Sequence, residues 1–150
     1  MAGQADFTPD EWMILQRAMM AAGVIVSLAE GAVDEDEMFA LMQELRGARH
    51  EDPHQLIREL AGIPSFATGL KLDTKFADYA GPGLEAIRSA SATIASKAPA
   101  DLPAFCEFLV ELCEQVANAN KEGGFAGLGA QWQTAAETAA IDSVKRALGV

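Results

Sequence analysis

The densest group of reactive side chains in this sequence is a short run of carboxylates. Glu30, Asp34, Glu35, Asp36 and Glu37 place five acids within eight residues. Carboxylate oxygens are the ligands that hard cations such as calcium and magnesium prefer. We therefore predict a divalent-cation site with Glu30, Asp34, Asp36 and Glu37 as its ligands. The run is not an EF-hand loop, because the required glycine and the distal glutamate are missing.

The same acids have a second interpretation that needs no ligand. Asp34 stands where a helix is expected to begin, and acids in a first turn interact favourably with the helix dipole. Runs of charge are also usually solvated faces. The two interpretations differ in one observable. A divalent cation should stabilise a metal site more than monovalent salt does at equal ionic strength.

The segment from His50 to His54 matches the zinc-protease pattern H-E-x-x-H letter for letter. That pattern works when one continuous helix places both histidines on one face. Pro53 lies inside the span and pushes Asp52 out of the helical region, so Asp52 is expected to cap a following helix. The chain has only two histidines, so no third one can complete a zinc site. We expect a polar connection between helices here.

Two further groups look reactive and are expected to be structural. Cys106 and Cys113 are expected on one helix, with Cα atoms roughly 10 Å apart, which is too far for a disulfide. Two core thiols fit a reducing cytoplasm. The glycine-rich run 123–129 lacks the Lys-Ser/Thr of a phosphate-binding loop and follows a helix instead of a strand. We expect Phe125 and Leu128 to fold it back onto the protein.

Capping residues mark where the helices that carry these side chains are expected to begin. A capping box pairs a Ser, Thr or Asp cap with a glutamate three residues later. Helix 9–30 also has Pro9 at its first position, and its apolar arc is so wide that we expect it at the centre of the fold. The pairs are Thr8 with Glu11, Asp34 with Glu37 and Thr134 with Glu137.

The remaining apolar periodicity is also helical. Strands are not expected, because no long stretch alternates apolar and polar residues. Gly81-Pro82-Gly83 is expected to break the chain. With 150 residues, the chain has the usual length of one domain. We therefore predict an all-α, single-domain bundle of about seven helices over 1–150, with helices near 34–47, 52–62, 84–97, 102–120 and 134–148 and one or two short ones in 65–80.

The net charge of the chain restricts the kinds of molecule that are expected to bind it. Its formal net charge is −11, which opposes binding to nucleic-acid phosphate or to an anionic membrane. The first residues lack the features of a signal peptide, and the longest apolar stretch, 18–29, is too short to span a bilayer. We expect a cytoplasmic protein with a basic protein partner and no membrane span, with a homodimer left open.

Two stretches of the chain share an order of elements. In each, a long apolar helix is followed by a loop and then by a capped helix, and the long helices end at Glu30 and Asn120. The second loop is longer by ten residues. A unit used twice predicts a pseudo-symmetric bundle in which the two long helices pack together.

This order, with the run from Ala29 to Glu37, resembles the tellurite-resistance TerB-like family, whose pattern is Ala-Asp-Gly, a short apolar step and an acid-rich helix start. The run 124–129 and the ending 147–149 are similar to the loop and tail of uncharacterised bacterial members. Glu30 stands where the family usually has aspartate, and Asn120 takes that place in the second copy, so a symmetric two-site function is not expected. The resemblance implies an all-α bundle linked to stress and metal-ion responses, and it implies no catalytic residues.

These observations favour a non-enzymatic cytoplasmic binding or scaffold protein of the TerB-like type. The alternative is a carboxylate-based, metal-dependent enzyme of the helical-bundle type. Such an enzyme needs glutamate and histidine side chains that face inward on several helices. The long helices here are almost purely apolar on their expected inner faces, which argues against the enzyme.

Overall fold

The computed structural model describes residues 2–31, 34–62, 74–119 and 134–150, and no strand occurs within these ranges. The prediction of an all-α fold is confirmed for this part of the chain. The described helices are η1 (Gln4–Asp6), α1 (Pro9–Leu28), α2 (Glu35–Glu51), α3 (Gln55–Leu60), α4 (Phe76–Lys97), η3 (Pro99–Asp101), α5 (Leu102–Asn118) and α6 (Ala135–Leu148).

The capping residues start the helices where the sequence predicts. At α1, Thr8 Oγ1 accepts from Glu11 N at 3.1 Å, and Glu11 Oε2 accepts from Thr8 N at 2.8 Å. Thr134 and Glu137 form the same reciprocal pair at the start of α6. Each pair satisfies two amides that the first helical turn leaves without an intrahelical partner.

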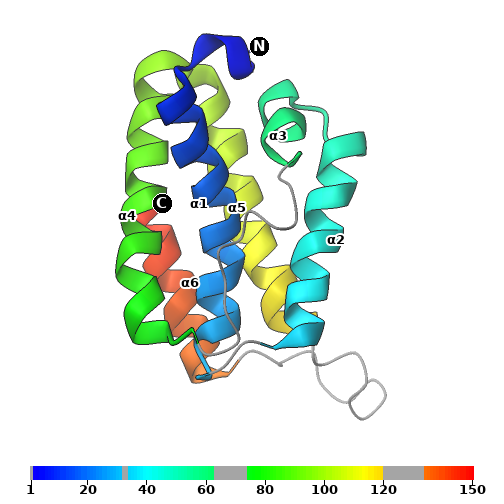
Figure 1. The fold of residues 1–150 in the computed structure, drawn as a ribbon, viewed down its shortest axis with the longest axis vertical. Helices are drawn as coiled ribbons and strands as arrows, with labels where there is room; N and C mark the ends of the chain where they lie inside the picture. The colour runs from blue at the N-terminus through cyan, green and yellow to red at the C-terminus, as the bar shows by residue number, and fades with distance from the viewer. Residues whose placement is uncertain (1, 32–33, 63–73, 120–133) are drawn as a thin grey trace.

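Helix α1 lies at the centre of the bundle (Figure 1) and packs against each of the other five described α-helices. Small residues allow this close approach: a Cβ atom added to Gly23 would lie only 2.6 Å from Leu41 Cδ1 of α2. Among the described helices, α1 alone is long and apolar enough to cross a membrane, and 72% of its apolar window is buried inside the bundle. The core of the bundle therefore accounts for the apolar character of α1.

Helix α4 corrects the predicted break at Gly81-Pro82-Gly83, because the helix runs through all three residues. A proline inside a helix costs about 3 kcal/mol. Pro82 is exposed, and α4 makes the most extensive interface in the bundle with α1, so packing outweighs that cost. Gly83 faces α1, where an added Cβ would lie 3.0 Å from Ile25 Cδ1.

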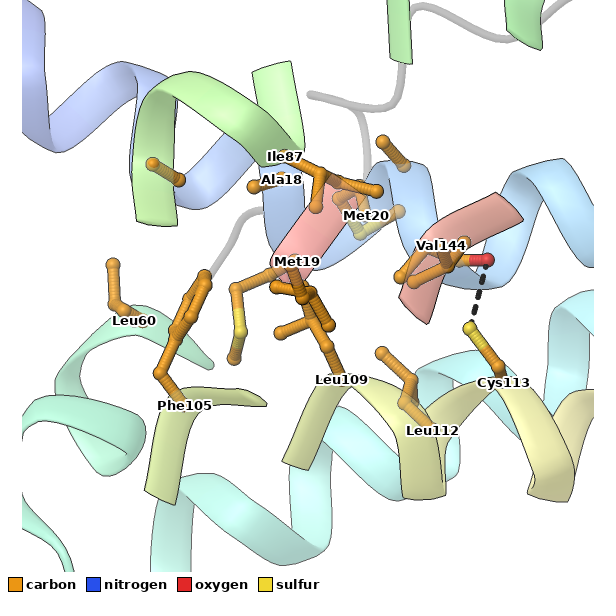
Figure 2. Close-up of a cluster of buried hydrophobic side chains, with 14 of the residues drawn as sticks. Ala18, Met19, Met20, Leu60, Ile87, Phe105, Leu109, Leu112, Cys113 and Val144 are labelled. Atoms are coloured by element: carbon orange, nitrogen blue, oxygen red, sulfur yellow. Dashed lines mark hydrogen bonds between the residues drawn. The ribbon is translucent and has the colours of Figure 1, made fainter. Parts of the chain in front are cut away.

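Helix α5 supplies the opposite wall of the core (Figure 2). Phe105, Leu109 and Leu112 are buried on the face of α5 that points toward α1. Cys113 lies on the same face, and its thiol donates to the carbonyl oxygen of Ala22 at 3.4 Å. Helices α1 and α5 pack together, as predicted for the two long apolar helices, although the larger interface of α1 is with α4.

Several predicted boundaries differ from the structure. Helix α2 continues past Gly47 to Glu51, because one exposed glycine weakens a helix by only about 1 kcal/mol. The short helices predicted in 65–80 fall partly in α4, and residues 63–73 lie outside the described ranges. The glycine-rich run 123–129 and Asn120 also lie outside them.

Candidate functional site

The predicted metal ligands occupy different environments in the structure. Glu30 and Asp36 are exposed, Asp34 is half-buried at the N-cap of α2, and Glu37 is only 4% exposed. Asp34 uses a carboxylate oxygen to accept from Glu37 N at 2.9 Å. In the described residues, no three Asp, Glu, His or Cys side chains are grouped closely enough to hold a metal ion. The divalent-cation site therefore stays a prediction without a supporting cluster.

Glu37 instead meets a second glutamate inside the bundle. Its carboxyl forms a side-chain hydrogen bond with the carboxyl of Glu137, which is 1% exposed in the first turn of α6. The hydroxyl of Ser27, near the end of α1, donates to Glu37 Oε1 at 3.3 Å. The C-terminal end of α1 and the N-terminal ends of α2 and α6 lie at the same end of the bundle (Figure 1). Three helices thus contribute to one buried polar cluster, and we call its two glutamates, Glu37 and Glu137, the carboxyl pair.

The environment favours a proton on this pair. Burial is the largest cause that raises the pKa of Glu37 to about 8, followed by the hydrogen bond with Glu137 and the charges of Glu137 and Asp34. The Ser27 hydroxyl acts in the opposite direction. The N-terminal helix dipole also favours the ionised form, but it contributes at most about 2 kcal/mol. A hydrogen bond between two carboxyl groups requires one of them to be protonated, so the pair holds a proton at neutral pH.

Sequence reasoning gave Glu137 only a capping role and missed its burial. Glu137 does cap α6, but it also lies four residues before Ile141, on the stripe that faces the core. Glu37 likewise lies four residues before the buried Leu41 of α2. Because residues four apart share a helix face, this phase is the signal that could have identified both glutamates as buried.

The H-E-x-x-H segment is broken, as predicted. Helix α2 ends at Glu51, and His54 is the N-cap of α3, so the two histidines lie on separate elements. The expectation that Asp52 caps α3 is wrong. Its carboxylate accepts from His54 N at 2.8 Å, which forms a tight turn and shifts the helix start to Gln55.

A second candidate site is a surface groove between α5 and the C-terminal end of α6, with a volume of about 910 Å³. We call it the α5–α6 groove. Its apolar lining comes from Leu102, Cys106 and Val110 of α5 and from Leu148 and Val150. Burial raises the pKa of the Cys106 thiol, so Cys106 behaves here as an apolar side chain.

The rim of the α5–α6 groove is acidic. Glu107, Glu111 and Glu114 are exposed on the same face of α5, and Lys145 of α6 lies on the opposite side. Glu111 also lines a smaller groove of about 350 Å³ on the other side of α5, toward α2. We call this the α2–α5 groove. It contains three further acids, Glu44, Glu51 and Asp52.

Comparisons of the chain with protein-family models, with curated proteins and with solved structures find no match. The resemblance to the TerB-like family therefore stays a prediction.

Proposed function

We propose that this protein is a non-enzymatic binding protein that holds the apolar face of a partner's helix in its α5–α6 groove. The observation that carries this proposal is the groove itself. Val110 and Cys106 lie four residues apart on one face of α5, and Leu148 faces them from α6. An amphipathic helix binds such a groove through apolar anchors spaced three or four residues apart.

The size of the groove supports a peptide-like occupant. A volume of about 910 Å³ is at the upper end of the range of about 300–1,000 Å³ found for ligand pockets. The groove is open to solvent along α5, a helix of 17 residues. A shape of this kind suits an elongated segment better than an enclosed small molecule.

The carboxyl pair gives less support to the alternative of a metal-dependent enzyme. Glu37 and Glu137 do face inward, which the sequence did not predict. They line neither the α5–α6 groove nor the α2–α5 groove, and no metal-binding group accompanies them in the described part of the chain. A proton shared by the two carboxyl groups already relieves their mutual repulsion, so neither residue requires a metal ion.

We further propose that the protein is of the TerB-like type and that α1–α2 and α5–α6 are two copies of one helix–loop–helix unit within a bundle of about seven helices. Glu37 and Glu137 occupy the third position of the second helix in each unit. Their meeting in the carboxyl pair supports a pseudo-symmetric origin. The resemblance would place the protein in a cytoplasmic stress or metal-ion response.

The test is titration of a labelled amphipathic helical peptide, built from leucine and glutamine, against two variants. Val110→Gln introduces a polar side chain into the groove and should weaken binding about tenfold, which is the loss of about 1.4 kcal/mol of apolar contact. Met13→Gln is the matched control, because Met13 is 54% exposed on α1 and lies outside the groove. Equal affinities for the two variants would contradict the proposed site.

A further inference from the structure

We propose that the helix bound in the α5–α6 groove is basic, and that a lysine or arginine of it crosses α5 at Glu111 to reach the α2–α5 groove. This inference rests on the proposed function and adds the chemistry of the partner. It treats the two grooves as one composite surface with an apolar half and an acidic half. Glu111 is the residue that lines both halves.

Three acids of α5 lie along one side of the apolar lining. Glu107, Glu111 and Glu114 follow one another at three- and four-residue intervals, so they form a continuous edge along one side of Cys106 and Val110. A helix seated on that apolar lining places the flanks of its own apolar face against this edge. Basic residues on those flanks would meet a carboxylate once per turn.

The α2–α5 groove carries negative charge. Its ionisable lining residues are all acids: Glu44, Glu51 and Asp52 join Glu111 there. Glu44 is partly buried, and burial together with the charge of Glu111 raises its pKa. The two carboxylates thus repel each other across the groove. A guanidinium or ammonium group between them would remove that repulsion and add charge-assisted hydrogen bonds.

The charge of this surface disfavours other occupants. Nucleic acid would bring phosphates against the acidic edge, and a chain with a net charge of −11 repels it at longer range. A second copy of this chain that docked through the same face would bring six of these glutamates together with only two lysines, the Lys145 of each copy. A basic segment is the occupant that the edge attracts and steers toward the groove.

The experiment compares three helical peptides with one apolar face: flanks of lysine, of glutamine or of glutamate. The wild-type protein should bind the lysine peptide at least tenfold more tightly than the glutamine peptide at low salt, with the difference shrinking as salt rises. Glu111→Gln should lower the affinity for the lysine peptide about three- to tenfold and leave the affinity for the glutamine peptide unchanged. Glu85→Gln is the matched control, because it removes one exposed acid from α4.

Charge reversal tests the position directly. Glu111→Lys should weaken binding of the lysine peptide and strengthen binding of the glutamate peptide. Glu85→Lys should change neither affinity beyond the small effect of net charge. If Glu111→Gln and Glu85→Gln have equal effects, the basic partner is excluded at this surface even when Val110→Gln still weakens the glutamine peptide. If Val110→Gln has no effect on any peptide, the groove itself is not the binding site, and the proposed function fails with it.

Discussion

Asp36 and Glu37 are neighbours in the sequence, yet the Asp36 side chain faces solvent and the Glu37 carboxyl is buried. Helical phase produces this difference. Glu37 precedes Leu41 and Leu45 on the inner stripe of α2, and Asp36 is rotated away from it. A buried carboxyl in this position needs partners, and Ser27 and Glu137 provide them.

The carboxyl pair makes the stability of the protein depend on pH. In the unfolded chain Glu37 titrates near 4.5, and in the folded protein its pKa is about 8. Between these values the folded state keeps a proton that the unfolded state has released, so stability falls as pH rises and levels off above about 8. The loss is at most about 5 kcal/mol, from the pKa difference. Glu37→Gln should abolish most of this fall, because glutamine mimics the protonated carboxyl.

Chemical denaturation at several pH values between about 4.5 and 9 measures this effect. Glu35→Gln is the matched control, because Glu35 is exposed in the same first turn of α2. The control should keep the pH dependence of the wild type. A wild-type slope retained in Glu37→Gln would show that the pair does not hold a proton in the folded state.

Ser27 is expected to matter more as pH rises. Its hydroxyl donates to Glu37 and lowers the pKa of that carboxyl, so it stabilises the ionised form preferentially. Ser27→Ala should cost about 1 kcal/mol near pH 9 and less near pH 5. Ser143→Ala is the comparison, because the Ser143 hydroxyl makes exposed hydrogen bonds with Ala139 and Arg146 of its own helix. An equal cost for Ser27→Ala at both pH values would argue against this assignment.

At the scale of elements, local capping signals were sufficient to predict where α1, α2 and α6 begin. They were not sufficient for α4, because the break expected at Pro82 is overridden by packing against α1, a contact between residues far apart in the sequence. The same limit explains why the α5–α6 groove was not predicted. Its two walls come from residues near 102–115 and 145–150, and only the folded bundle brings them together.

The contact between α4 and α1 makes a specific prediction for two helical glycines. Gly83→Val should destabilise the protein by roughly 1–3 kcal/mol, because its side chain would enter the space occupied by Ile25 and Ala21. Gly47→Val should be nearly neutral, since nothing lies within 4 Å of an added Cβ there and valine is the better helix former. Thermal unfolding of both variants checks the difference, and equal melting temperatures would mean that α4 does not approach α1 this closely.

At the scale of the whole molecule, the excess of acids could be read from composition, but its distribution could not. The sequence pointed to the acidic run from 30 to 37 as the candidate site. Two acids of that run, Glu30 and Asp36, are exposed to solvent in the structure. The acids that line grooves, Glu44 and Glu111 among them, are spaced along α2 and α5 without any local motif. Their proximity depends on the packing of these two helices.

The sequence predicts a divalent-specific rise in melting temperature, but two of the four predicted ligands already have other partners in the structure. Glu37 is turned inward toward Glu137, and Asp34 accepts a hydrogen bond from Glu37 N as the cap of α2. Calcium or magnesium chloride should therefore act no more strongly than sodium chloride at matched ionic strength. Thermal scans of the wild type and of Glu30→Gln with Asp34→Asn decide the point. A divalent-specific rise that this double variant removes would restore the metal site.

Mapping the binding surface by NMR tests directly where a partner helix docks. Addition of the lysine-flanked amphipathic peptide to the isotopically labelled protein should shift amide signals of α5 from Leu102 to Gln115 and of the last turn of α6. The amide signals of Glu44 and Glu51 should also shift if the basic side chain reaches the α2–α5 groove. Amides on the outer face of α4, including Glu85, should stay in place. Shifts centred on α4, or spread evenly over the acidic surface, would show that the α5–α6 groove is not the docking site.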